Sequence, residues 1–188
     1  MMIQALAERI VRYIGSRCPL CAEEREKCKY SLRILLYTVF STAGLLMIGM
    51  ISGSVWQTVL VIAVLYANQT VGGGYHADTE AGCFTAMAAG LTGILILIRC
   101  RIPLYILVII LVLSYTVLLL IPVTFHRNKK YLQKTASDHK RRSEAVSTLC
   151  FAACSVLCII QAEAYYPAMI LSCAWAAFSR VIGLIRNT

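Results

Sequence analysis

Hydrophobic and polar residues alternate in long blocks along this chain of 188 residues. No Asp, Glu, Lys or Arg occurs between Ile34 and Ala77. A helix crosses the hydrocarbon layer of a bilayer with about 20 apolar residues. Backbone groups in lipid must also form hydrogen bonds within the protein, which favours helices over open strands. The pattern therefore predicts an all-α, polytopic integral membrane protein.

About six apolar helical segments can be read from the sequence, and they fill a membrane region that covers residues 34–185. The second segment is short for a full crossing, unless it tilts or includes the uncharged residues after it. The fourth is the longest, with Pro103 near its start and Pro122 near its end. The six predicted segments are residues 34–51, 55–68, 82–98, 102–124, 145–162 and 166–185.

Two further segments precede the membrane region and complete a single predicted domain, residues 1–188. In residues 1–16, apolar side chains recur at helical spacing opposite Glu8, Arg9 and Arg12. This amphipathic helix suits the membrane interface, or it packs against the rest of the protein. Residues 17–33 form a charged stretch that we expect in the cytoplasm. The N-terminus lacks the continuous apolar region of a cleavable signal peptide.

The positive charge of the chain is concentrated in a predicted loop, residues 126–142. By the positive-inside rule this basic loop lies in the cytoplasm. Counting the spans outward from it also places the N-terminus, the glycine-rich motif described below and the C-terminus in the cytoplasm. Topology thus explains the net charge of +9, and no nucleic-acid partner is needed. The basic residues of the loop are Arg127, Lys129, Lys130, Lys134, Lys140, Arg141 and Arg142.

The nine cysteines do not indicate a disulfide framework, which is typical of small secreted domains. Cys150, Cys154 and Cys158 recur every four residues on one predicted helix, where we expect them to pack as small apolar residues. Cys18 and Cys21 form one CxxC pair, without a second pair or a nearby histidine, and are weak evidence for a metal or redox site. We predict no metal and no cofactor.

The stretch VGGGYHADTEAGC, residues 71–83, interrupts the apolar pattern. Each of Gly72, Gly73 and Gly74 destabilises a helix by roughly 1 kcal/mol relative to alanine and permits positive φ. We therefore expect the second apolar segment to end at these three glycines, which would act as a backbone hinge. A broken backbone at membrane depth survives where protein or water covers it, typically at a functional site.

His76 and Cys83 within this stretch are candidates for a catalytic pair. On one straight helix they would lie about 10 Å apart along the axis, whereas proton transfer needs roughly 3 Å or one bridging water. They can act together only if the chain bends between them. The imidazole would then take the thiol proton, and a position in the first turn of a helix would favour the thiolate. Asp78 or Glu80 is a candidate to orient His76.

The residues Gly73-Gly74-Tyr75-His76-Ala77, followed by Cys83, resemble the signature of the accessory gene regulator B (AgrB) family. Members of this family are integral-membrane cysteine endopeptidases of Gram-positive bacteria. The chain length, the amphipathic N-terminus and the basic loop after Pro122 agree with the family layout. The family commonly has a basic pair at the positions of Gln69 and Thr70, and a serine at the position of Met87. These replacements bear on peptide specificity.

The resemblance implies a quorum-sensing enzyme in the cell membrane that acts on an AgrD-like precursor peptide with an acidic C-terminal tail. Cys83 would attack a backbone carbonyl, release the tail and form an acyl-thioester. A thiol or hydroxyl of the peptide would then close a thiolactone or lactone ring. The basic loop would attract the acidic tail, or would only fix the topology. The resemblance also implies a homodimer.

Two other classes of function compete with this interpretation. A transporter or channel could place an ion site at the broken segment, with His76, Asp78 and Glu80 as ionisable groups. However, no predicted span carries a charge near its middle, and no inverted repeat is visible. A metal-dependent hydrolase could use His76 and Cys83 as ligands, but a third ligand at helical spacing is missing.

Overall fold

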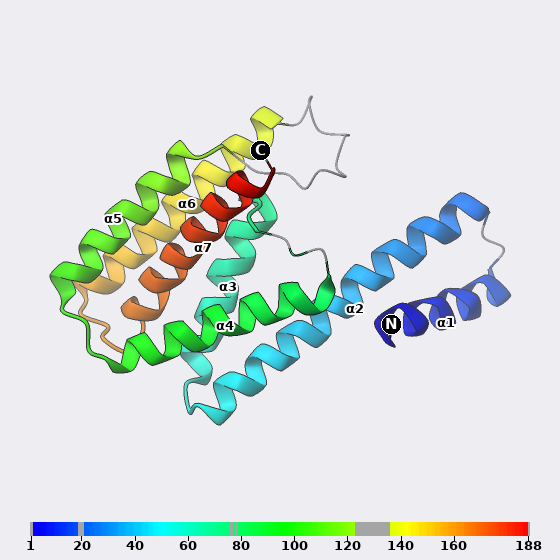
Figure 1. The fold of residues 1–188 in the computed structure, drawn as a ribbon, viewed down its shortest axis with the longest axis horizontal. Helices are drawn as coiled ribbons and strands as arrows, with labels where there is room; N and C mark the ends of the chain where they lie inside the picture. The colour runs from blue at the N-terminus through cyan, green and yellow to red at the C-terminus, as the bar shows by residue number, and fades with distance from the viewer. Residues whose placement is uncertain (1, 19–20, 76, 78, 123–135, 188) are drawn as a thin grey trace. The chain divides into compact units, whose positions relative to one another are not determined.

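The computed structural model describes residues 2–18, 21–75, 77, 79–122 and 136–187 (Figure 1). Within these residues the chain forms helices and no strands, which confirms the all-α prediction. Five of the helices are long and apolar enough to cross a membrane, namely α2, α3, α4, α6 and α7. The helices are α1 (Met2–Arg17), α2 (Ala22–Ile51), α3 (Val55–Gly72), α4 (Glu80–Arg99), α5 (Leu104–Leu120), α6 (Ala136–Ile159) and α7 (Tyr166–Asn187).

The chain divides into two compact units, Met1–Gly44 and Leu45–Thr188. In the first unit, α1 buries Ala7 and Val11, as its amphipathic pattern predicts. An ion pair of 2.7 Å joins Glu8 of α1 to Lys29 of α2. The hydrogen bond and charge of Lys29 lower the pKa of the Glu8 carboxyl below its usual value.

Helix α2 begins well before the predicted apolar segment at residue 34, because a capping box starts it. The backbone N–H of Cys21 donates to the Glu24 carboxylate at 2.9 Å, and the N–H of Glu24 donates to the Cys21 sulfur at 3.5 Å. Two otherwise unpaired N–H groups are satisfied in this way. The charged stretch at residues 17–33 is therefore largely helical and continuous with the first apolar segment.

Prolines and glycines set the other helix ends. Helix α3 continues through the uncharged residues after position 68 and reaches 18 residues. The segment predicted at residues 102–124 is not the longest helix, because α5 has only 17 residues. The helix begins after Pro103 and ends at Leu120. The next residue, Ile121, has an extended backbone, which the following Pro122 favours. Helix α6 starts at Ala136, so the last part of the predicted basic loop is helical.

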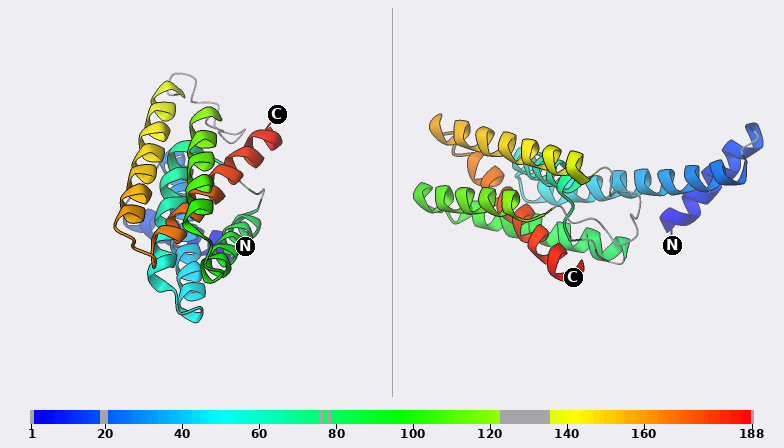
Figure 2. Two further views of the ribbon diagram at one scale, coloured as in Figure 1. Left: turned by 90° about the vertical axis from the view of Figure 1, so that its left-hand side faces the viewer. Right: turned by 90° about the horizontal axis from the view of Figure 1, so that it is seen from above.

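Helix α7 forms the centre of the second unit, where it contacts α3, α4, α5 and α6. The views in Figures 1 and 2 show α5, α6 and α7 side by side, with α3 next to α6 and α7. Small residues allow two close approaches within this unit. A Cβ atom at residue 49 or 90 would overlap Thr58 or Trp175, respectively, so Gly49 and Gly90 serve packing within one chain.

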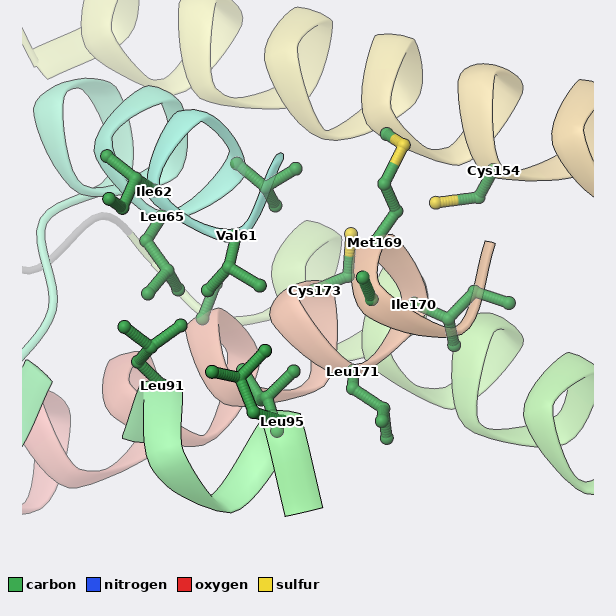
Figure 3. Packing of buried hydrophobic residues seen from close by; sticks show 14 of the residues in the cluster. Val61, Ile62, Leu65, Leu91, Leu95, Cys154, Met169, Ile170, Leu171 and Cys173 are labelled. Carbon is green, nitrogen blue, oxygen red and sulfur yellow. The ribbon is translucent and has the colours of Figure 1, made fainter. Parts of the chain in front are cut away.

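The apolar core of the second unit lies between α3, α4, α5, α6 and α7, and Figure 3 shows part of it. Leu65 of α3 and Leu91 of α4 point toward each other, and Ile170 of α7 is fully buried. Cys154 is also fully buried, and Cys150 and Cys158 pack against the same core, as their spacing predicted. Large apolar side chains that remain exposed, such as Leu113 and Leu120, suit contact with lipid.

Candidate active site

The backbone breaks between α3 and α4, where the three glycines were expected to end the second apolar segment. Helix α3 stops at Gly72, and the N–H of Gly73 makes the last bond, to the carbonyl of Gln69 at 3.2 Å. Gly73 and Gly74 have φ values of 66° and 153°, which residues with a Cβ atom rarely adopt. Residues 71–83 therefore do not form one helix, and this part of the prediction is confirmed.

The glycine segment packs directly on α7. The backbone N–H of Tyr75 donates to Ser179 Oγ at 3.0 Å. A Cβ atom at residue 183 would lie 2.8 Å from the carbonyl carbon and oxygen of Gly74, so two glycines meet where the backbones touch. The guanidinium of Arg186 lies 5.4 Å from the centre of the Tyr75 ring. Three residues of α7 thus hold the segment that precedes His76 in the sequence.

Arg180 of α7 is almost completely buried, with 1% of its surface exposed. Its Nη1 donates to the carbonyl of Leu118 at 2.6 Å, and its Nη2 donates to Ser143 Oγ at 2.8 Å. A Cβ atom at residue 72 would overlap the guanidinium, so Gly72 makes room for it. These contacts bring the end of α3, the end of α5 and the start of α6 together at one end of the helix bundle.

Cys83 lies in the first turn of α4, the position that would favour a thiolate. Thr79 caps this helix, because its side-chain oxygen accepts the N–H of Gly82 at 3.0 Å. The N–H of Cys83 donates to the carbonyl of Thr79 at 3.0 Å, the first bond of the helix ladder. Glu80 is the first residue of α4, where the positive end of the helix dipole stabilises a carboxylate.

A cavity of about 140 Å³ opens beside Cys83. Tyr75 and Cys83 both line it, so two parts of the motif that are eight residues apart meet at one cavity. Gln69 and Met87, two of the positions at which the chain departs from the expected pattern, line it as well. The remaining lining residues belong to α4 and α7 and are Ala86, Trp175, Phe178, Ser179 and Ile182.

Comparison with protein-family models finds one that matches residues 7–180, described as accessory gene regulator B. The chain belongs to the AgrB family. No curated protein and no solved structure matches it. With its apolar helices, this AgrB-family chain is a membrane protein of quorum-sensing signal processing.

Several predicted site residues of this AgrB-family chain lie outside the described residues. They are His76, Asp78, Lys129, Lys130 and Lys134, so the pairing of His76 with Cys83 stays a prediction. Lys140, Arg141 and Arg142 are exposed on the first turns of α6, and Lys140 approaches Glu144 at 3.8 Å.

Sequence reasoning missed the α7 residues of this AgrB-family site. Arg180 was visible as a charged residue in an apolar segment, and such residues are functional candidates by default. Because Arg180 lies toward the end of the predicted segment 166–185, it did not count as a charge near the middle of a span. Ser179, Trp175 and Phe178 carry no comparable signal, because nothing local marks their contacts with the glycine segment and α4.

Proposed function

We propose that this AgrB-family protein is a membrane cysteine endopeptidase that releases the C-terminal tail of an AgrD-like precursor peptide and promotes its macrocyclisation. The observation that supports this most strongly is the shared cavity of Tyr75 and Cys83. His76 follows Tyr75 in the sequence, and the glycine break lets this part of the chain approach the start of α4.

In the first half of the reaction, His76 accepts the proton of the Cys83 thiol. The sulfur attacks the carbonyl carbon of the scissile peptide bond, and the carbonyl becomes a tetrahedral oxyanion. When this intermediate collapses, the C–N bond breaks and the imidazolium protonates the departing amine. The tail leaves with a free amino group, and the rest of the precursor remains as an acyl-thioester on Cys83. Asp78 or Glu80 orients His76 in this scheme.

In the second half, a thiol or hydroxyl inside the bound peptide gives its proton to His76. Its sulfur or oxygen attacks the thioester carbonyl, and the Cys83 sulfur leaves and recovers the proton. The product is a thiolactone or lactone ring. The thioester retains activation that hydrolysis would waste, so a cavity with apolar walls that limits water favours ring closure. No oxidation, reduction or ATP is required by this balance.

The basic start of α6 suits an acidic peptide tail. Ser143 directly follows Arg141 and Arg142 in the sequence, and it bonds to the same Arg180 that packs on Gly72. The exposed basic residues of α6 therefore belong to the end of the bundle that carries the glycine segment. We infer that they attract the tail, and that this end of the bundle faces the cytoplasm.

Tail release from a synthetic precursor by the protein in lipid vesicles tests the proposal. Cys83→Ala and His76→Ala should each abolish release, whereas Cys100→Ala should retain it. Cys100 is the matched control because it is a free cysteine just beyond the far end of α4.

Release that persists in Cys83→Ala would exclude the cysteine mechanism. A transporter would move solute without Cys83, and a metal-dependent hydrolase would lose activity on chelation with both residues intact. Each of these results is distinct from the one that we expect.

A further inference from the structure

The cavity beside Cys83 has the volume of one large apolar group. It measures about 140 Å³, and an engineered cavity of about 150 Å³ lined by apolar side chains binds benzene. A leucine or phenylalanine side chain is of this size, whereas alanine would leave most of the space empty.

One face of α4 and one face of α7 form the walls. Cys83, Ala86 and Met87 recur at helical spacing on α4. Trp175, Phe178, Ser179 and Ile182 do the same on α7, and the rings of Trp175 and Phe178 lie 5.6 Å apart. Gly90 lets the Trp175 ring approach α4 closely, since any Cβ at that position would overlap it. The width of the cavity therefore depends on how closely α4 and α7 approach.

The lining also sets the chemistry of the occupant. Among the described residues that line the cavity, none is charged. Burial of an unpaired charge there would be costly, whereas an apolar side chain gains from leaving water. The exposed cations that suit an acidic tail, Lys140, Arg141 and Arg142, are not part of this lining. The cavity thus suits an apolar residue on the N-terminal side of the scissile bond, and the basic residues suit the acidic tail on its C-terminal side.

We propose that this cavity is a specificity pocket that receives one leucine- to phenylalanine-sized apolar side chain, from the precursor residue whose carbonyl Cys83 attacks. The proposal rests on the proposed endopeptidase function. Ala86 and Met87 set the size limit, and Trp175 and Phe178 supply the aromatic wall.

The test compares precursors that differ only at this residue, with Ala, Leu, Phe or Asp before the scissile bond. We expect the parent protein to process the Leu and Phe precursors at least about tenfold faster than the Ala precursor. The free energy gained by burying an apolar side chain of this size corresponds to at least that ratio of rates. The Asp precursor should be the slowest.

Ala86→Leu fills the pocket and should reverse the order, so that the Ala precursor becomes the better substrate. Ala89→Leu is the matched control, because Ala89 is exposed on the same helix and does not line the cavity. Its substrate order should equal that of the parent. An unchanged order in Ala86→Leu, with activity retained, would overturn the pocket assignment and leave the endopeptidase function intact.

A second measurement needs no peptide processing. The quantity measured is the ratio of the alkylation rate with N-benzyl iodoacetamide to that with N-methyl iodoacetamide. This ratio should be about tenfold higher at Cys83 than at Cys100, because the benzyl group occupies the cavity. Ala86→Leu should remove this advantage. Equal reagent preferences at Cys83 and Cys100 in the parent would refute the pocket. Conversely, a preserved benzyl preference without any tail release would refute the endopeptidase function alone.

Discussion

The contact between Gly183 and Gly74 offers a sharp perturbation of the proposed site. In Gly183→Ala the new Cβ would lie 2.8 Å from the carbonyl carbon of Gly74 and 3.1 Å from the Tyr75 nitrogen. Carbon atoms in contact prefer about 3.5 Å or more, so the two backbones must separate by roughly 0.7 Å. No side-chain rotation can relieve this overlap, because the atoms that are met belong to the backbone.

The displacement should affect catalysis more than stability. A shift of about 1 Å in a catalytic group can cost about 100-fold in rate, so we expect kcat/KM for tail release to fall by roughly 10- to 100-fold. For stability, an overlap costing about 1–3 kcal/mol is partly offset by the roughly 1 kcal/mol that alanine gains over glycine in a helix. The melting temperature should therefore fall only slightly.

The assay measures tail-release kinetics and thermal unfolding on the same vesicle preparation. Gly93→Ala is the control, because a Cβ at residue 93 meets no atom within 4 Å. It should keep full activity and unfold at the same or a higher temperature. Full kcat/KM in Gly183→Ala would refute the view that α7 positions the glycine segment for catalysis.

Three further predictions concern other contacts of the protein. Gly90→Ala should displace the Trp175 ring and weaken the preference for the Phe precursor over the Ala precursor, whereas Gly93→Ala should leave this preference unchanged. Equal preferences of the two variants in a kinetic comparison would contradict the prediction. Ser143→Ala removes a hydrogen bond from the buried Arg180 and should lower the free energy of unfolding by about 1–3 kcal/mol, measured by thermal unfolding in detergent. Ser155→Ala is its control, since Ser155 Oγ donates only within its own helix, to Phe151, and a loss as large as that of Ser143→Ala would contradict the prediction. Lys29 lowers the pKa of Glu8, so their ion pair stabilises the first unit at pH values above the ordinary carboxyl pKa. This stabilisation is lost as the pH falls through the lowered pKa, and the rate of amide exchange in α1 should rise in that range. Glu8→Gln should show no such rise.

The features that local residues determine could be predicted from the sequence. Apolar runs located the membrane helices, and three consecutive glycines located the break after α3. The third segment, predicted from residue 82, begins at Glu80 after its cap Thr79. The early start of α2 was missed, although the Cys21 and Glu24 capping box is a local signal. The charges of residues 17–33 indicate a cytoplasmic stretch, but they do not indicate whether it is helical.

The support of the site could not be predicted in this way. The bond from Tyr75 to Ser179 joins residues 104 positions apart, and Arg180 meets Ser143 across 37 positions. No periodicity within one helix reports such contacts, because they depend on how whole helices pack. The cavity beside Cys83 is likewise formed by two helix faces that are separate in the sequence.

The most direct test of the account is to trap the acyl-enzyme. A precursor whose internal thiol or hydroxyl has been removed cannot close the ring, so the intermediate should accumulate. After an acid quench, peptide mapping by mass spectrometry should find the N-terminal fragment of the precursor on Cys83, and hydroxylamine should remove it. Tail release with an unmodified Cys83, or an adduct on another cysteine that persists in Cys83→Ala, would contradict the account.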